Sequence, residues 1–318
     1  MKNLAILKFG GFSVSNSDKI SFVSNRIKSF LSKYKKLIVV LSAPADITDD
    51  LLKISKKFSS DPRSLDMLLS SGENISISLM NMALNANNLK SIALNQYQAE
   101  IKTTPTHGNS KILSVNKKKI IGLLKIYDVI ILPGFVGIDK NLNITTLGRG
   151  GSDYTAVYIS KIFDSPCYLL SDIKGVYSSN PSKIEYAKKL KEISYKELFE
   201  ISKVDFEIRQ TKAIRYAMKQ NVRLYLGSSM ENAKPTLIRN YTQNFKPEIK
   251  YISLARNEND IKISMIGEKI ILRKDLINKT KKYPFKKIFL NRNKITLLFQ
   301  KCDEKDLIKK LYKDFILK

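Results

Sequence analysis

The sequence has 318 residues, 43% of them hydrophobic, with 13 Gly and 9 Pro, and this composition excludes collagen-like, mucin-like and wholly disordered proteins. No stretch approaches the roughly 18 consecutive apolar residues of a membrane span, and the first apolar run is too short for a signal peptide, so we expect a cytoplasmic protein of about two domains. The 56 basic and 29 acidic residues give a net charge of +27, but only ten of the basic residues are Arg and the Lys are spread along the chain, which indicates a solvated surface more than a nucleic-acid-binding patch.

Short apolar strands alternate with amphipathic segments through residue 226, which predicts an α/β domain with a mostly parallel central sheet covered by helices on both faces. The expected strands are 4–9, 36–41, 91–94, 129–132, 167–171 and 222–226. The expected helices, in which apolar residues recur three and four apart, are 19–31, 73–85, 153–163 and 212–220.

A polar stretch, residues 228–247, separates this pattern from a smaller one, and we place the domain boundary between residues 245 and 246. In the second part, 246–318, the expected strands are 251–255, 261–266, 286–290 and 295–299, and the expected helices are 272–279 and 304–315. This pattern predicts an α+β module of roughly 70 residues, small enough to need a partner surface for full stability.

A pair of glycines, Gly10 and Gly11, follows the first expected strand. Glycines at a strand end let the backbone approach a phosphate closely, and the helix that follows offers unpaired amide groups and a positive dipole end. The side chain of Lys8 would then reach a phosphoryl group during its transfer. The segment lacks the spacing of a P-loop, and a plain turn between a strand and a helix is the alternative interpretation.

A second glycine-rich segment, residues 145–153, opens a clean amphipathic helix. Its three glycines leave a helix N-terminus without side chains, while Arg149 and Asp153 remain there as charges. This arrangement is suited to holding an anion and to organising a lysine or magnesium. The alternative is a flexible loop capped by Ser152 or Asp153.

Cysteine and histidine are scarce, which excludes several chemistries. Cys167 and Cys302 cannot form a zinc cluster alone, and we interpret both as small buried apolar residues that a reducing compartment keeps as thiols. His107 is the only histidine, which removes most Ser/His/Asp schemes and any multi-histidine metal site. A kinase that uses magnesium needs no histidine.

Residues 8–14 and 145–155 resemble the two signature motifs of aspartokinases, which are members of the amino-acid kinase superfamily. Further matches follow in chain order: SAP and ITD within 42–49, LSSGE at 69–73, YQA at 97–99, HGN at 107–109, GFVG at 134–137, and SDIKGVY with NP within 171–181. The resemblance covers residues 1 to about 245, and as an ordered set of spaced motifs it is much more specific than either glycine loop alone.

The resemblance implies a three-layer amino-acid kinase fold and transfer of the ATP γ-phosphoryl group to the β-carboxylate of L-aspartate. The product would be 4-phospho-L-aspartate, the first step towards lysine, threonine and methionine. ATP and Mg²⁺ are the implied cofactors, with Mg²⁺ held mainly through the ATP phosphates and not directly by the protein. Positioning and charge neutralisation do most of the work in such transfers, because a carboxylate acceptor needs no general base.

By matched position, the resemblance assigns a role to each of several residues. The catalytic residues are Lys8 and Asp153. The phosphate-binding residues are Lys8, Gly10, Gly11, Gly150 and Gly151. The substrate-binding residues are Ser42, Thr48, Glu73, Arg149 and Ser152. The nucleotide-binding residues are Ser171, Asp172, Tyr177 and Lys183. Within these sets Asp153 would organise Lys8, Arg149 would pair with a substrate carboxylate, and Glu73 would take the α-amino group.

Three positions depart from the aspartokinase pattern. Phe12 replaces the usual threonine after the paired glycines, and Ser182 replaces an arginine, with Lys183 next to it. Glu207 lies in the segment 205–211, where the family has a phosphate-contacting lysine. A negative charge there would weaken ATP binding unless Arg209 or Lys212 reaches the phosphates.

The C-terminal module resembles part of the aspartokinase regulatory region, where two ACT domains usually bind an end-product amino acid and mediate dimerisation. Residues 246–318 are near one ACT domain in length. We therefore expect a shortened ACT-like domain, a homodimer formed through it, and weak or no feedback inhibition. No nucleic-acid or membrane partner is expected.

Several alternatives stay open at this point. The chain could instead be another amino-acid kinase. It could also be a catalytically weakened kinase that binds a small molecule or acts in assembly, or a basic nucleic-acid-binding protein. Individual residues have structural alternatives as well: Glu73 and Thr48 as helix caps, Tyr177 as a core aromatic residue, and Asp172 as a turn residue.

Overall fold

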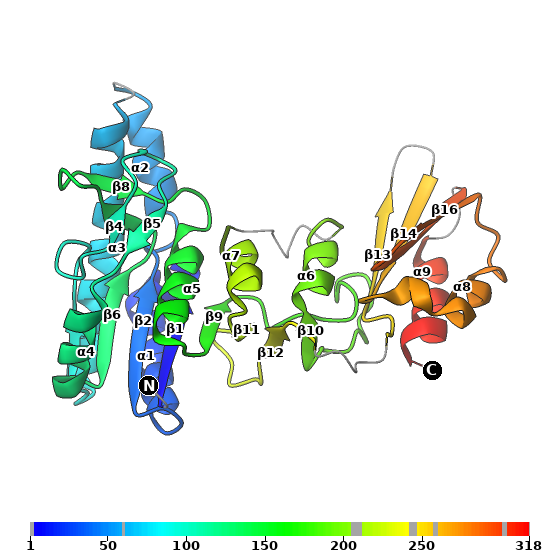
Figure 1. The fold of residues 1–318 in the computed structure, drawn as a ribbon, viewed down its shortest axis with the longest axis horizontal. Helices are drawn as coiled ribbons and strands as arrows, with labels where there is room; N and C mark the ends of the chain where they lie inside the picture. The colour runs from blue at the N-terminus through cyan, green and yellow to red at the C-terminus, as the bar shows by residue number, and fades with distance from the viewer. Residues whose placement is uncertain are drawn as a thin grey trace. The chain divides into compact units, whose positions relative to one another are not determined.

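The computed structural model describes residues 3–58, 61–204, 212–241, 247–256, 260–300 and 304–317. The chain divides into two compact units (Figure 1). The first unit is Met1–Lys174 with Thr211–Pro235, and the second unit is Gly175–Gln210 with Thr236–Lys318. This division differs from the boundary expected between residues 245 and 246, because the segment that follows residue 174 packs with the C-terminal part of the chain.

Parallel strands form the centre of the first unit, as the sequence predicts. Among its described residues they lie in the order β11 (Leu224–Ser228), β9 (Cys167–Ser171), β1 (Leu4–Phe9), β2 (Lys36–Leu41), β6 (Val129–Pro133) and β3 (Ser91–Ala93). Strands β1, β2 and β9 have the predicted bounds, and β11 begins two residues later than expected. The central strands are buried on both faces, which explains their unbroken apolar runs.

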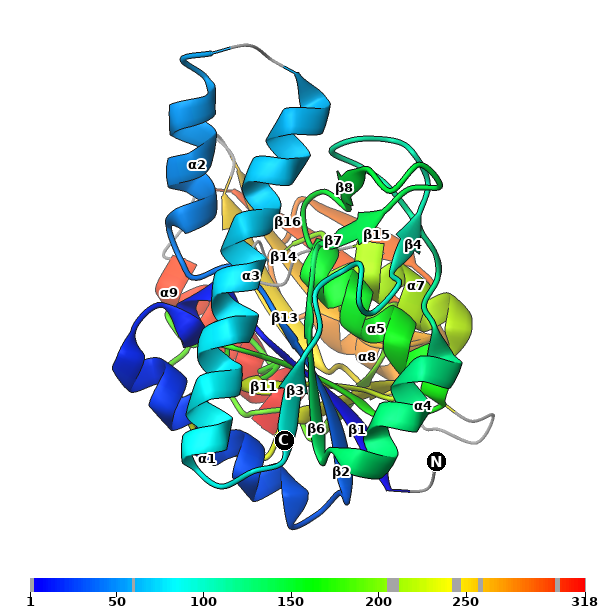
Figure 2. The ribbon, with the colours of Figure 1, turned by 90° about the vertical axis from the view of Figure 1, so that its left-hand side faces the viewer.

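Helices cover both faces of this sheet (Figure 2). They are α1 (Ser17–Leu31), α3 (Pro62–Ala86), α4 (Lys117–Ile126), α5 (Gly151–Phe163) and α7 (Lys212–Gln220). Helix α2 (Ile47–Ser55) packs on α3, and the 3₁₀ turn η1 (Gly11–Val14) packs on α1. On one face α1 and α3 pack against alternate strand residues such as Leu7 and Val39. Helix α3 begins well before the expected residue 73, because the side chain of Asp61 caps it and Pro62 occupies its first turn.

A small sheet that the sequence does not predict lies beside the carboxyl ends of β1 and β2. It has the order β5 (Ile112–Ser114), β4 (Lys102–Thr103), β7 (Val136–Ile138) and β8 (Ile144–Thr146) among the described residues. These strands have two or three residues each, too short to produce a readable alternation of apolar and polar side chains. Strand β8 matters for function because it leads directly into the second glycine-rich loop.

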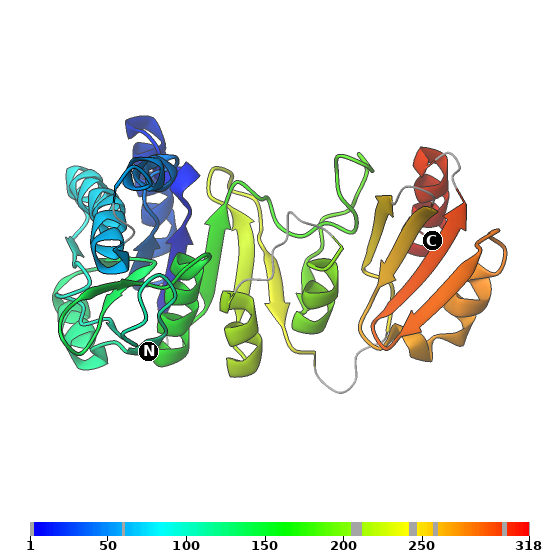
Figure 3. The ribbon, with the colours of Figure 1, turned by 90° about the horizontal axis from the view of Figure 1, so that it is seen from above.

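The second unit contains a small antiparallel sheet with helices on one face (Figure 3). The described strands lie in the order β13 (Tyr251–Arg256), β14 (Asp260–Ile266), β16 (Lys294–Gln300) and β15 (Lys287–Asn291). The other elements are β10 (Glu192–Ser194) paired with β12 (Thr236–Arg239), and α6 (Tyr195–Ile201), α8 (Lys274–Thr280), α9 (Glu304–Tyr312), η2 (Ile270–Leu272) and η3 (Lys313–Leu317). Ile184 packs in the same core as the sheet, which places the segment after residue 174 in this unit.

The predicted fold class is confirmed: a mixed α/β protein with a mostly parallel central sheet and a small antiparallel sheet in its C-terminal region. Cys167 is a buried free thiol, as expected, whereas Cys302 lies outside the described residues. Within the part of the chain that the structure describes, no helix is both long enough and apolar enough to cross a bilayer.

Candidate functional site

A cavity of about 270 Å³ opens where β1 and β2 end, the edge of a parallel sheet at which ligands usually bind. It lies entirely within the first unit. Its lining contains residues from both glycine-rich segments and from the predicted substrate set: Lys8, Ser42, Ala43, Thr48, Glu73, Phe135, Gly148, Arg149, Gly150, Gly151, Ser152 and Asp153. The fold thus brings together side chains that are more than 140 positions apart in the sequence.

Lys8 and Asp153 form an ion pair in this cavity. The Nζ atom of Lys8 lies 2.8 Å from Oδ1 of Asp153, and the lysine side chain is only 12% exposed. Lys8 is the penultimate residue of β1, and Asp153 lies in the first turn of α5. The carboxylate therefore holds an ammonium group beside the positive end of a helix, where it can neutralise oxygens of a transferred phosphoryl group.

Glu73 faces the same cavity from α3 and is 3% exposed. Its Oε1 atom accepts a hydrogen bond from the amide of Ala43 (3.3 Å), and its Oε2 atom has no hydrogen-bond partner among the described residues. Burial raises the pKa of Glu73 to about 8. A buried carboxylate oxygen without a partner is costly, so an ammonium group bound in the cavity would stabilise the ionised form.

Gly72 explains why Glu73 can reach this position. A Cβ atom added to Gly72 would lie 2.7 Å from the Cβ atom of Ala43, so only glycine lets α3 approach the turn after β2. The same turn carries Ser42, and Thr48 follows in the first turn of α2. The predicted hydroxyl groups and the buried carboxylate thus lie along one wall of the cavity.

Another part of the lining is the loop between β8 and α5. Gly148 and Gly150 have positive φ angles (74° and 75°), which favour glycine, and Arg149 between them is exposed. Arg149 makes no ion pair with any described residue, so its guanidinium group is available to a bound carboxylate. The cavity therefore presents one cation and one anion, Arg149 and Glu73, that are not paired with each other.

The first glycine pair lies next to the cavity and not in its lining. The amide of Gly10 donates to the carbonyl of Leu170 (3.3 Å), and a Cβ atom added to Gly11 would lie 2.6 Å from the carbonyl oxygen of Ala43. Their predicted role in phosphate binding therefore stays a prediction. Phe12, the first departure from the aspartokinase pattern, is 48% exposed and lies under Nζ of Lys19, 3.4 Å from the ring centroid.

The predicted nucleotide-binding residues do not line the cavity. Ser171 is the last residue of β9 and Asp172 follows it in the first unit, and the Oγ atom of Ser171 accepts from the amide of Ile173 (3.2 Å). Tyr177 and Lys183 belong to the second unit, where Nζ of Lys183 donates to the carbonyl of Leu254 (2.7 Å). Their nucleotide roles stay predictions.

Of the other two departures from the family pattern, the structure describes Ser182 and does not describe Glu207. The amide and the hydroxyl group of Ser182 both donate to Oδ1 of Asn180 (2.9 and 2.7 Å), a local turn. Glu207 and Arg209 lie outside the described residues, with the rest of the segment 205–211. Nζ of Lys212 donates to the carbonyl of Ser110 (2.7 Å) and stacks over the ring of Tyr154.

Sequence reasoning assigned no site role to three lining residues, Ala43, Phe135 and Gly148. Phe135 has φ = 66°, an uncommon angle for a non-glycine residue, and its ring would contact any side chain at Gly151. The segment 134–137 was singled out by its resemblance to aspartokinases, so a signal existed for Phe135. Ala43 lies in the SAP match within 42–49, so a signal existed for it too, but it contributes a backbone amide, which residue identity does not indicate.

Comparisons with known proteins agree with this geometry. A model of the amino acid kinase family matches residues 3–228. An aspartokinase of Geobacillus stearothermophilus is 36% identical over 239 residues, which are 74% of this chain and 59% of the relative. The chain spans less than two thirds of the length of the curated relatives it matches first.

Two solved structures have the same fold. The structure of E. coli aspartokinase III in complex with lysine and aspartate has a TM-score of 0.84 at 17% identity, and covers 98% of this chain and 99% of the other. The structure of the same enzyme in complex with aspartate and ADP has a TM-score of 0.67 at 20% identity, and covers 97% of this chain and 83% of the other. At these identities the likeness is one of fold.

Proposed function

The chain belongs to the amino acid kinase family, and we propose that it is an aspartokinase. It transfers the γ-phosphoryl group of ATP to the β-carboxylate of L-aspartate and forms 4-phospho-L-aspartate. Curated relatives that are 36–37% identical over 74% of this chain are aspartokinases, which supports this choice within the family.

The observation that carries the proposal is the buried Oε2 atom of Glu73, which faces the cavity without a partner among the described residues. An α-amino group bound there satisfies this oxygen and lowers the cost of ionising the carboxyl group. Arg149, which also lines the cavity, then pairs with a carboxylate of the same amino acid. The aspartate bound by E. coli aspartokinase III carries this combination of charges.

The chemical step needs charge neutralisation and alignment more than proton transfer. The attacking β-carboxylate is already ionised at neutral pH, so no general base is required. The ammonium group of Lys8, held by Asp153, neutralises charge on the phosphoryl oxygens as they move from ADP to the carboxylate. The backbone amides at the N-terminus of α5 add further hydrogen-bond donors to the phosphoryl group, because Gly150 and Gly151 have no side chains to cover them.

Mg²⁺ fits this site as a companion of ATP. The cavity lining contains two carboxylates, Glu73 and Asp153, and Lys8 already neutralises the second. Mg²⁺ usually keeps several waters and is bound by one or two carboxylates together with substrate phosphates. We therefore assign its main ligands to the phosphates of ATP, and the nucleotide itself to residues that include Ser171 and Asp172 at the end of β9.

The weakened-kinase alternative rests on Phe12, which does not line the cavity, and on Glu207, which lies outside the described residues. Lys8, Asp153, Glu73 and Arg149 are all present in that lining. This complete set of charged groups favours an active enzyme over a binding or assembly protein.

The test is a hydroxamate assay with Mg²⁺ and ATP, in which hydroxylamine traps the acyl phosphate. We expect product with L-aspartate and background signal with L-glutamate or without an amino acid. Product with glutamate but not aspartate would assign the chain to another amino-acid kinase, and no product from folded protein would support the weakened-kinase alternative.

A further inference from the structure

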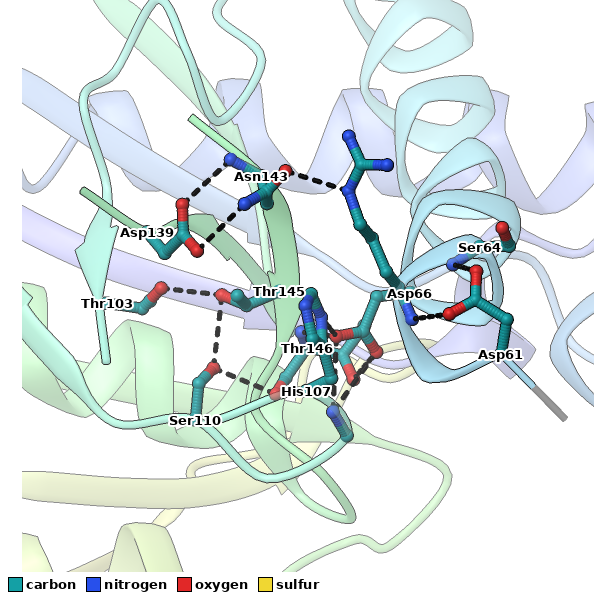
Figure 4. Close-up of polar contacts among 12 residues, drawn as sticks. Asp61, Ser64, Asp66, Thr103, His107, Ser110, Asp139, Asn143, Thr145 and Thr146 are labelled. Atoms are coloured by element: carbon teal, nitrogen blue, oxygen red, sulfur yellow. Dashed lines mark hydrogen bonds and ion pairs between the residues drawn. The ribbon is translucent and has the colours of Figure 1, made fainter. Parts of the chain in front are cut away.

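Asp66 is a buried carboxylate on α3 that does not line the cavity and has no role in the chemistry described above. It is 1% exposed. Four donors meet on its two oxygens (Figure 4): Nδ1 of His107 at 2.8 Å, the amide of Gly108 at 3.1 Å, and the amide and hydroxyl group of Thr146 at 3.1 and 2.6 Å. A carboxylate only accepts hydrogen bonds, so Nδ1 of His107 carries the proton it donates.

These four donors come from two segments that are distant from α3 in the sequence. His107 and Gly108 belong to a turn between β4 and β5, and Thr146 is the last residue of β8. Hydrogen bonds to an ionised acceptor are stronger than neutral ones, and each donor would lose its partner if the carboxylate were removed. Asp66 therefore connects three segments of the first unit through hydrogen bonds: α3, the turn between β4 and β5, and the end of β8.

These hydrogen bonds hold the start of the loop that carries Arg149, because this loop begins at the residue after Thr146. The turn also supports this loop by packing, since a Cβ atom added to Gly148 would lie 3.0 Å from the carbonyl oxygen of Gly108. The hydroxyl group of Ser110 donates to the carbonyl of Thr146 (2.8 Å) and holds the same corner from the other side.

Asp66 lies on α3, the helix that also carries Glu73. Asp66 and Glu73 are seven residues apart, two turns of one helix, so both lie on the same face at a separation of about 10 Å along the axis. The helix is a rigid spacer between the point that holds the Arg149 loop and the carboxylate that faces the cavity. Strand β8 also packs along α3.

We propose that Asp66 is a positioning residue that sets the distance between Arg149 and Glu73, and thereby the affinity for the amino-acid substrate. The inference deepens the proposed function and rests on it for the identity of the substrate. Asp66 acts through Thr146 and Gly108 and touches no substrate atom. Its loss should let the Arg149 loop move away from α3 while the Lys8–Asp153 pair, on β1 and α5, stays in place.

The test compares Asp66→Asn with the matched control Asp61→Asn. An asparagine of the same size keeps one acceptor oxygen but turns an NH₂ group towards donors. Asp61 caps the start of the same helix, accepting from the amides of Arg63 and Ser64. Asparagine caps a helix about as well as aspartate, so this variant makes the same Asp-to-Asn change on α3 without touching the loop. The milder Thr146→Val removes only the hydroxyl donor and covers the case in which Asp66→Asn does not fold.

Two readouts separate positioning from a loss of stability. In kinetics, we expect Asp66→Asn to raise KM for L-aspartate about tenfold or more, as for a lost charge-assisted hydrogen bond, with KM for ATP within about twofold of the parent. A purely structural role would lower the active fraction and leave KM unchanged. In hydrogen exchange, amides of residues 146–151 should exchange about tenfold faster or more in Asp66→Asn and at the parent rate in Asp61→Asn. Thr146→Val should shift both readouts in the same direction by less.

The exchange experiment does not depend on activity, so it distinguishes failure of this inference from failure of the proposed function. If the parent protein makes no acyl phosphate, the proposed function is wrong and the exchange rates alone decide the role of Asp66. A folded Asp66→Asn or Thr146→Val protein whose loop amides exchange as in the parent overturns the inference. An unchanged KM for L-aspartate in an active Asp66→Asn enzyme overturns it as well.

Discussion

Glu73 and Lys8 bring opposite charges to one cavity, and their surroundings give them different behaviour. Lys8 has a carboxylate partner at 2.8 Å, whereas Glu73 has one backbone donor and one oxygen without a partner among the described residues. Burial without compensation raises the pKa of Glu73 to about 8. At the scale of single residues, this difference predicts how substrate binding depends on pH and which substitution stops the reaction.

We expect the binding of L-aspartate to strengthen as the pH rises from 7 to 8.5. Below its raised pKa, Glu73 is mainly protonated in the empty cavity, and binding an ammonium group requires the ionised form, so the proton must leave. KM for L-aspartate should therefore fall over this range in the parent. In Glu73→Gln it should be about tenfold higher or more and independent of pH, because the charge-assisted hydrogen bond is gone. Steady-state kinetics at a series of pH values measures both, and a flat KM in the parent would contradict the role of Glu73.

Lys8→Ala should lower kcat by about 10² to 10³-fold or more, because it removes a preorganised cation at the phosphoryl group. The control is Lys36→Ala, which breaks an ion pair of the same kind with Asp128 (2.9 Å) at the other end of the sheet. We expect the control to keep kcat within about twofold, since a partly exposed ion pair contributes little to stability. Full activity of a folded Lys8→Ala enzyme in the hydroxamate assay would remove Lys8 from the mechanism.

At the scale of elements, α3 is the part on which the site depends most. It carries Asp66, Gly72 and Glu73, and it packs against α1, α2, β3, β6 and β8. Its cap at Asp61 and its proline start the helix early enough for Asp66 to face Thr146. The site thus depends on the length of this helix as well as on its residues.

Gly72→Ala should weaken both stability and substrate binding, because the added Cβ atom would lie 2.7 Å from the Cβ atom of Ala43 and push α3 away from the turn after β2. We expect a loss of about 1–3 kcal/mol in the free energy of unfolding and a higher KM for L-aspartate. Gly122→Ala in α4 is the control, since nothing lies within 4 Å of its added Cβ atom. It should raise stability by about 0.5–1 kcal/mol by helix propensity alone.

Denaturant unfolding and steady-state kinetics check this pair of variants. We expect the free energy of unfolding to fall in Gly72→Ala and to rise in Gly122→Ala. Equal stability of Gly72→Ala and Gly122→Ala would show that α3 adjusts to the extra methyl group without cost.

At the scale of the whole molecule, the sheet of the second unit has an exposed edge strand that could pair with another chain. Strand β15 pairs only with β16 among the described residues, and its Phe289 is 56% exposed. An exposed apolar edge strand favours pairing with another chain. We therefore expect a homodimer formed through this edge.

Phe289→Lys should convert this dimer to a monomer, because a lysine at the edge opposes pairing. Leu272→Lys, at an exposed apolar position on η2, is the matched control and should leave the dimer intact. Sedimentation velocity at several concentrations measures the oligomeric state. A monomeric parent, or a Phe289→Lys variant that dimerises like the parent, would contradict the expected interface.

The alternation of strands and helices, the two glycine-rich loops and the family could all be inferred from the amino-acid sequence. Strands such as 4–9 and 36–41 were predicted with their observed bounds, because unbroken apolar runs between turn signals are a local property of the chain. Lys8, Glu73, Arg149 and Asp153 could also be selected before the structure, because each lies in a motif that resembles the aspartokinase pattern.

The motifs did not indicate which of these residues meet in space, and the folded chain shows it. It placed Lys8, Glu73, Arg149 and Asp153 in one cavity and left Gly10 outside its lining. It also revealed the contacts of Asp66, which depend on a turn and a short strand far away in the chain. The physical reason is that hydrogen bonds and burial depend on distances across the fold, whereas the sequence pattern records only which face of each element is apolar.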